Sequence, residues 1–189
     1  DEILKIIEEA KSSVYIASYS FNYKKIINIL KNKNLKDIKI FIGAKSNLPF
    51  SSDKIKIYEG SNLFHLKFIV IDNEITIVGS GNFTENDFRL FHNNFLIIKD
   101  REISDFFMEK FLSLWNNQNN EKSFKNKFIE IYFSPENNIE QKIIEEIKKG
   151  EKNIYFAHFY FTSEDITKSL IEQKKNKVDI RGIFESYNT

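Results

Sequence analysis

An internal repeat constrains the fold more than any other feature of the sequence. Residues 4–21 (LKIIEEAKSSVYIASYSF) and residues 144–161 (IEEIKKGEKNIYFAHFYF) both begin as an amphipathic helix and end in a strand rich in aromatic and β-branched residues. A second helix and a second strand follow in each copy, and the second strands are DIKIFIG from Asp37 and DIRGIFE from Asp179. The order helix, strand, helix, strand in both copies predicts α/β layering.

The two copies differ in how far they continue. The first runs on well beyond its DIKIFIG strand, whereas the sequence reaches Thr189 soon after DIRGIFE. We therefore expect one nearly complete module over residues 1–120 and the beginning of a second over residues 128–189. A polar stretch rich in Asn and Lys, residues 116–127, is typical of a seam between them.

Composition excludes several classes of protein. The chain has 19 Phe and 8 Tyr, enough to bury a sizeable core, so it is not a disordered chain. It has no Cys, which excludes disulfides and Cys-based zinc sites. The net charge is +1, so any affinity for phosphate must come from local groups.

No apolar run approaches the length of a membrane span. The first residue is Asp1 rather than Met, so we expect a preceding segment, and the localisation stays open.

The stretch between the repeats predicts a hairpin, a tight loop and a helix. Residues 66–71 and 74–78 read as two strands that turn at Asp72 and Asn73. The loop that starts at Gly79 leads into a helix whose Thr84 and Asp87 are spaced as in a capping box. The aromatic residues of the first repeat, among them Tyr19, are expected in the core. His92 and His158 are expected to be structural.

One spacing in this stretch is highly specific. His65, Lys67 and Asp72, followed after six residues by Gly79-Ser80-Gly81-Asn82, follow the pattern H-x-K-x4-D-x6-G-S-x-N. This pattern resembles the signature of the phospholipase D superfamily, and every fixed position matches. The resemblance extends over nearly the whole chain. It implies a mixed sheet flanked by helices, an active site built from two similar modules, and catalysis without a metal ion or other cofactor.

The residues of the motif suit the cleavage of a phosphodiester. On a strand, His65 and Lys67 would share a face and point into one cleft. A neutral imidazole at His65 can attack phosphorus and form a phosphohistidine, while Lys67 supplies positive charge to the non-bridging oxygens. Ser80 and Asn82 add donors from a glycine-flanked loop that can approach a phosphate closely. The resemblance gives Asp72 a structural or electrostatic supporting role.

One position departs from the nuclease-like members of the superfamily. In those members an acidic residue follows the motif Asn by eleven positions and orients the nucleophilic His, but here that position is Asn93. An amide oxygen can still accept the imidazole N–H and fix its tautomer, although it cannot stabilise an imidazolium by charge. Asn93 is therefore predicted to orient His65. Glu85 or Asp87 could supply the missing charge, or the site could be degenerate.

Three functions stay open at this stage. A nuclease acting on DNA or RNA is favoured, because the short modules and the segments 107–115 and 131–135 resemble the bacterial nuclease and mitochondrial cardiolipin hydrolase branch. A phospholipase D or phosphatidyltransferase acting on phospholipids would use the same residues, but the sequence offers no evident docking stretch with exposed Trp or Phe. The third is a degenerate module that binds phosphate polymers or acts as a scaffold.

The proposed chemistry also needs a second functional group. A phosphohistidine mechanism requires an acid for the leaving oxygen, and the resemblance implies that it is the His of a facing module. The offset from Asp37 to Asp179, applied to His65, places that His beyond Thr189. We therefore expect either a continuation with a second H-x-K or a symmetric homodimer that completes the active site, and little turnover from residues 1–189 as a monomer.

Overall fold

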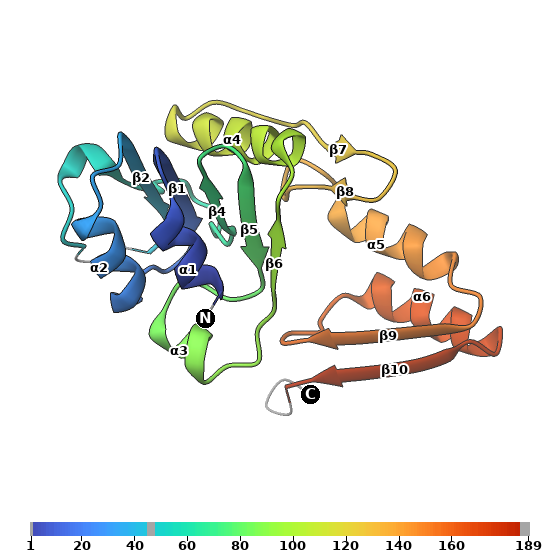
Figure 1. Ribbon diagram of the computed structural model, residues 1–189. Helices are drawn as coiled ribbons and strands as arrows, with labels where there is room; N and C mark the ends of the chain where they lie inside the picture. Colours follow the sequence, from blue (N-terminus) through green and yellow to red (C-terminus); the bar gives the residue numbers. More distant parts are fainter. Residues whose placement is uncertain (1, 45–47, 186–189) are drawn as a thin grey trace. The chain divides into compact units, whose positions relative to one another are not determined.

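The computed structural model describes residues 2–44 and 48–185 and divides the chain into two compact units, Asp1–Asn120 and Glu121–Thr189 (Figure 1). The ends of the two predicted modules, Asp1 and residues 186–189, lie outside the described residues. None of the helices within the described ranges combines the length and hydropathy needed to cross a bilayer.

Unit 1 is built on a six-stranded mixed sheet with the strand order β3-β2-β1-β4-β5-β6. Its strands are β1 (Ser13–Ser18), β2 (Asp37–Ile42), β3 (Ile55–Ile57), β4 (Lys67–Ile71), β5 (Ile75–Gly79) and β6 (Phe95–Ile98). The first three strands run parallel, and β4, β5 and β6 are joined to β1 and to one another by antiparallel pairing. The predicted mixed sheet is confirmed.

Helices cover both faces of this sheet. They are α1 (Glu2–Glu9), α2 (Lys24–Asn32), the short 3-10 helix η1 (Ser52–Lys54), α3 (Glu85–Arg89) and α4 (Arg101–Trp115). Because side chains alternate along a strand, Val14 of β1 joins the core with α1 and α2, while Tyr15 turns to the other face. There its ring meets Phe111 of α4 at 5.2 Å between ring centroids.

The predicted hairpin is β4 and β5, which pair from Phe68 opposite Val78 to Ile71 opposite Ile75. Asp72 and Asn73 form its turn with φ values of 53° and 56°. Two consecutive residues with positive φ are typical of the tight turns that match the twist of a hairpin, and Asp and Asn tolerate this conformation better than most residues. The turn therefore forms at the position that the sequence indicates.

From its first helix onward, unit 2 repeats the order of elements at the beginning of unit 1. Its elements are β7 (Phe124–Lys125), β8 (Glu130–Ile131), α5 (Ile139–Lys148), β9 (Asn153–His158), α6 (Glu164–Lys175) and β10 (Asp179–Phe184). β9 and β10 pair in parallel, as β1 and β2 do. The similarity between the two units extends to individual hydrogen bonds, because Tyr15 donates to Asp37 at 2.6 Å and Tyr155 donates to Asp179 at 2.8 Å.

Candidate active site

The sheet brings three segments of unit 1 to one edge. β4 runs antiparallel to β1, so Lys67 at the start of β4 lies opposite Ser18 at the end of β1. β5 runs back along β4, so the chain that leaves β5 through Gly79 and Ser80 returns to the same edge. The topology therefore collects the residues after β1, the residues at the start of β4 and the residues after β5.

The loop after β5 is fixed to the segment after β1. Phe83 is fully buried and forms a bridge with Phe21, and its carbonyl oxygen accepts hydrogen bonds from the backbone N–H groups of Asn22 and Tyr23 at 3.2 and 3.1 Å. One residue earlier, Asn82 accepts from the backbone N–H of Ser20 at 3.4 Å. Asn82 is thereby held at the same edge as the start of β4.

His65 lies in the loop that precedes β4, and not on the strand itself. The expectation that it shares a strand face with Lys67 is wrong in this respect, because β4 begins at Lys67. The imidazole is exposed, and its ring centroid lies 5.8 Å from that of Tyr19. Partial removal from water lowers the pKa of His65, and the positive charge of Lys67 lowers it further against the opposing effect of Asp87. The neutral imidazole that a nucleophile needs is favoured.

Lys67 is almost entirely buried, with 6% of its surface exposed. Its ammonium group donates a hydrogen bond to the backbone carbonyl of His65 at 2.7 Å, which places its charge next to the imidazole-bearing residue. Burial lowers the pKa of Lys67 to about 8, while the charge of Asp87 acts in the opposite direction. Lys67 is therefore still mostly protonated at neutral pH.

Ser80 and Asn93 form one hydrogen-bonded group. The Ser80 hydroxyl donates to Asn93 Oδ1 at 2.9 Å and accepts from the backbone N–H of Asn94 at 3.1 Å. Gly81 permits this approach, because a Cβ there would lie 2.9 Å from Cγ of Asn93. Asn93 Nδ2 donates to Asp87 Oδ1 at 3.1 Å. The hydrogen bonds of the described residues include none between Asn93 and the imidazole, so the orienting role of Asn93 stays a prediction.

Asp72 lies at the far end of β4 from His65. Its carboxylate accepts hydrogen bonds from the backbone N–H groups of Lys11, Ser12 and Ser13 at 2.7, 2.8 and 2.8 Å, and from the Ser12 hydroxyl at 2.9 Å. Partial burial opposes ionisation, but these hydrogen bonds outweigh it and lower the pKa of Asp72. The contacts support the structural part of its predicted role, because they join the hairpin turn to the link between α1 and β1.

Asp72→Ala is expected to lower the free energy of unfolding by about 2 kcal/mol, because the backbone N–H groups that donate to the carboxylate lose their acceptor. The lowered pKa of Asp72 stabilises the fold at pH values above the pKa that Asp72 has in the unfolded chain. This contribution is lost as the pH falls through the pKa of Asp72 in the folded chain. Urea unfolding at neutral and acidic pH measures both effects. Glu74→Ala, at an exposed neighbour, is the control and should change stability little.

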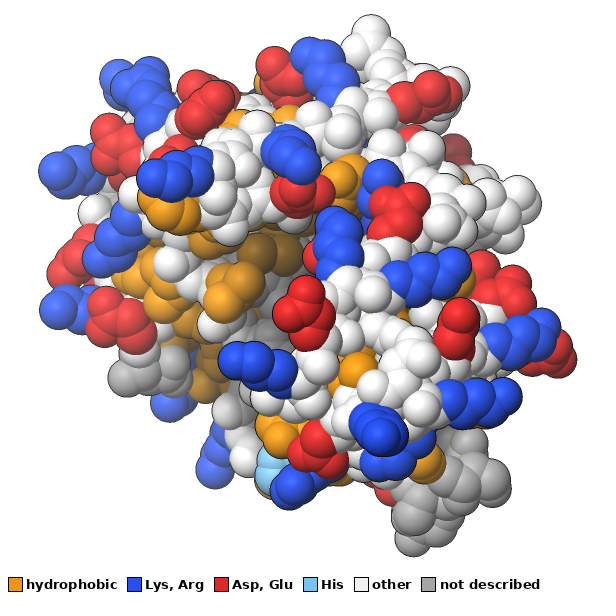
Figure 2. Space-filling view, turned by 90° about the vertical axis from the view of Figure 1, so that its right-hand side faces the viewer, with side chains coloured by type: hydrophobic (Ala, Val, Ile, Leu, Met, Phe, Trp, Pro, Cys, Tyr) orange, Lys and Arg blue, Asp and Glu red, His pale blue; other side chains and the backbone are white. Residues whose placement is uncertain are grey.

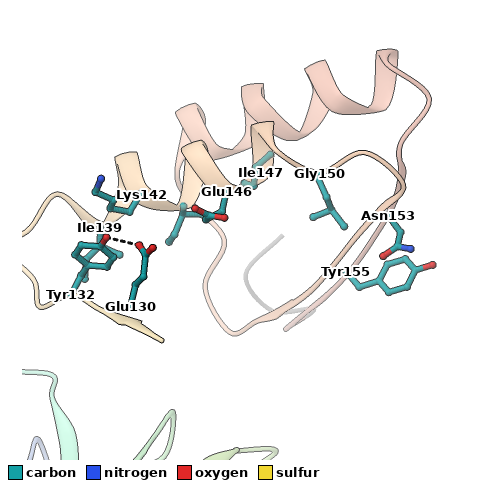
Figure 3. A pocket seen from close by; sticks show the side chains of 11 residues that line it. Glu130, Tyr132, Ile139, Lys142, Glu146, Ile147, Gly150, Asn153 and Tyr155 are labelled. Atoms are coloured by element: carbon teal, nitrogen blue, oxygen red, sulfur yellow. Dashed lines mark hydrogen bonds between the residues drawn. The ribbon is translucent and has the colours of Figure 1, made fainter. Parts of the chain in front are cut away.

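A pocket of about 860 Å³ lies within unit 2, between α5, β8 and β9 (Figure 3). The described residues that line it include none of the predicted site residues. At one end Tyr132 donates to Glu130 at 2.7 Å, and the Lys142 ammonium lies 5.6 Å from the centre of the Tyr132 ring. These polar groups satisfy one another, so we assign no chemistry to this pocket. In the ranges 2–44 and 48–185, no three His, Asp or Glu side chains converge to hold a metal ion.

Fold and motif together identify the chain as a member of the phospholipase D superfamily. The chain belongs to the family described as "Cardiolipin synthase, PLD-like domain", whose model matches residues 3–115 and 143–189. The match includes the whole segment from His65 to Asn93 and both copies of the internal repeat.

Relatives and solved structures agree with this assignment. A protein of Rickettsia prowazekii named phospholipase D is 29% identical over 122 residues, which cover 59% of this chain and 60% of that protein. The chain thus spans about three fifths of the length of the curated relatives it matches. The phospholipase D family member Nuc from Salmonella typhimurium is 27% identical, with a TM-score of 0.51 over 61% of this chain and 85% of Nuc. Phosphatidylserine synthase of Haemophilus influenzae has the same fold, with a TM-score of 0.67 and 14% identity over 97% of this chain and 58% of that protein.

Sequence reasoning missed the place of Tyr19. Its position in an aromatic run suggested the core, as holds for the buried Phe21, but the Tyr19 ring lies against His65. The available signal was topological, since Tyr19 directly follows β1 and the end of that strand shares an edge with the start of β4.

Proposed function

We propose that this protein is a phosphodiesterase, and specifically a nuclease that cleaves DNA or RNA through a phosphohistidine, without a metal ion. The observation that carries the proposal is the pairing of an exposed imidazole of lowered pKa with a buried ammonium at the same sheet edge as Ser80 and Asn82. An imidazole nitrogen of His65 donates its electron pair to phosphorus, and the bond from phosphorus to the leaving oxygen breaks. Water then attacks phosphorus, and the N–P bond breaks to release the phosphate product and the imidazole.

Lys67, Ser80 and Asn82 would stabilise the charge that develops on the phosphoryl oxygens. Lys67 cannot leave its place readily, because its side chain is buried and its ammonium is bonded to the His65 carbonyl. Fixed donors of this kind stabilise a transition state without reorganising during the reaction. The loop that bears Ser80 and Asn82 is held by the buried Phe83 on one side and by Asn93 and Asn94 on the other.

The ring of Tyr19 supports nucleic acid as the substrate. It lies beside the His65 ring and is only partly buried, so a base next to the scissile phosphate could stack on it. Acidic and basic side chains are interspersed on the face shown in Figure 2, in keeping with the net charge of +1. The stacking of a base on Tyr19, more than a broad positive field, is therefore expected to provide the affinity for nucleic acid.

Tyr19→Leu should weaken the binding of single-stranded DNA about 10-fold, the typical effect of removing one base-stacking ring. Fluorescence anisotropy with a labelled oligonucleotide measures this loss, and Tyr132→Leu, which removes a tyrosine of unit 2, is the matched control. Equal affinity of the Tyr19→Leu and wild-type proteins would remove Tyr19 from the substrate site.

Phospholipid remains a second candidate because of exposed apolar residues in the loops around the site. Leu63, two residues before His65, is 70% exposed, and Leu90 and Phe91, shortly before Asn93, are 69% and 61% exposed. The sequence alone offers no evident docking stretch with an exposed Phe, and the structure adds that Phe91 is exposed. Apolar loops of this kind can enter a lipid interface, and they are compatible with the name phospholipase D carried by the Rickettsia relatives.

An assay in EDTA separates these candidates. Single-stranded DNA, duplex DNA, RNA and vesicles of phosphatidyl lipids are offered to the same preparation, and released products are followed in each. The proposal expects cleavage of at least one nucleic acid. Cleavage of lipid alone would exclude the nuclease and select the second candidate.

We further propose that a second module, or a second copy of this chain, supplies the acid for the leaving oxygen. The described part of unit 2 lacks an H-x-K pair, since His158 is followed by Phe159 and Tyr160. In unit 1 the face of the sheet that bears Phe41 is covered, and Phe41 is only 5% exposed. The equivalent residue in unit 2 is Ile183, which is 76% exposed. Light scattering recorded alongside the assay reports whether turnover accompanies pairing.

A further inference from the structure

We infer that Asp87 is a positioning residue of this site, which holds Ser80 in place through Asn93 and supplies the negative charge that faces His65 and Lys67. The inference rests on the proposed function, and it concerns a residue outside the sequence motif. It accounts for how a site with an uncharged residue at position 93 can still balance the charge of Lys67 and the charge that forms on His65 during attack.

Both oxygens of the Asp87 carboxylate have fixed partners. The backbone N–H of Asp87 donates to the Thr84 hydroxyl at 3.3 Å, and that hydroxyl donates in return to Asp87 Oδ2. Asp87 Oδ1 accepts from Asn93 Nδ2 at 3.1 Å. The hydrogen bonds with Thr84, the N-cap residue of α3, therefore set the direction of the carboxylate before any substrate binds.

From the carboxylate a chain of hydrogen bonds leads into the phosphate-binding loop. Asn93 uses its N–H₂ group toward Asp87, so its amide oxygen is directed to the Ser80 hydroxyl. A half-buried amide that is hydrogen-bonded through both its N–H₂ group and its oxygen is held in one orientation. The amide oxygen of Asn93 thereby fixes the direction of the Ser80 hydroxyl. The position of Ser80 thus depends on Asp87, which is seven residues further along the chain.

The same carboxylate is electrostatically coupled to both reacting groups. The charged groups that act on His65 are Lys67 and Asp87, and the one that acts on Lys67 is Asp87. Asp87 raises the pKa of each against the effect of burial. It therefore favours the protonated ammonium of Lys67 and would stabilise the positive charge that forms on the imidazole when His65 attacks phosphorus.

Asp87→Asn tests this inference, because it removes the charge but keeps an oxygen that can accept from Asn93. The chain has 3 His, so an NMR titration of the imidazoles can follow each one. We expect the pKa of the His65 imidazole to fall in this variant, because the charge of Asp87 raises it in the wild type. We also expect the pKa of Lys67 to fall below its value of about 8. Both limbs of the pH–rate profile should move to lower pH.

Glu85→Gln is the matched control, because Glu85 lies on the same short helix and pairs with Arg89 at 2.8 Å. It removes one negative charge without touching Asn93, and the His65 titration should not move. Asp87→Glu keeps the charge and should retain most of the wild-type pH dependence.

Several results would overturn the inference. An unchanged His65 titration in Asp87→Asn would do so, as would an equal shift in Glu85→Gln. If Asp87→Asn does not fold, the titration of His65 in Asp87→Ser replaces it, and an unchanged pKa of His65 in that variant would overturn the inference equally. If the His65 titration moves as expected but no nucleic acid is cleaved, the inference stands and the proposed nuclease function fails.

Discussion

His65→Ala is expected to abolish turnover and to leave the fold intact. Among the described residues collected at this sheet edge, His65 carries the imidazole beside Lys67, so the covalent step loses its nucleophile. The cost in stability should be small, because the imidazole is exposed and lies before β4, outside the hydrogen-bonded ladder. Turnover of the preferred substrate, together with a circular dichroism melt, measures both parts of the expectation.

His92→Ala is the natural control for this experiment. His92 is an exposed imidazole on the loop between α3 and β6, close in sequence to Asn93, but its neighbours do not form an H-x-K pattern. Its removal should change the rate little. Turnover that survives in His65→Ala, or a rate that depends strictly on added Mg²⁺, would contradict the phosphohistidine mechanism.

Local sequence patterns predicted the hairpin turn and the helix cap of unit 1. The hairpin turns at Asp72 and Asn73, and Thr84 caps α3 by accepting from the backbone N–H of Asp87, both as expected. Each of these features depends on residues that are close together in the chain, where the preferences of single side chains decide the backbone conformation. The repeat predicted the order helix, strand, helix, strand that both units show.

Contacts between distant segments were beyond the reach of these patterns. Asp72 binds the backbone of residues 11–13, and Tyr19 meets His65, in each case across a stretch of chain whose course is set by the sheet as a whole. The burial of Lys67 also follows from the sheet, because β4 is covered on both faces. Such effects alter a pKa and the role of a residue without leaving a local signal in the sequence.

Lys67→Met is expected to slow turnover by about 10²–10³-fold, the size that follows from the loss of one transition-state stabiliser. The same change should stabilise the fold at neutral pH. The pKa of Lys67 is about 8 in the folded chain, below its usual value of 10.5, so burial of the ammonium opposes folding. Between these two pH values the unfolded chain binds more protons at Lys67 than the folded chain does, so the stability of the wild-type protein should rise with pH. The stability of the variant should lack this rise.

Rate and stability are thus expected to change in opposite directions in Lys67→Met, which separates a catalytic role from a structural one. A structural lysine would lose stability on substitution, since its hydrogen bond to the His65 carbonyl would be broken without compensation. Urea midpoints and single-turnover rates across pH 6–10 measure both changes, and Lys110→Met, at another buried lysine of unit 1, is the control. A rate within a few fold of the wild type would mean that the ammonium of Lys67 does not act on the phosphoryl oxygens.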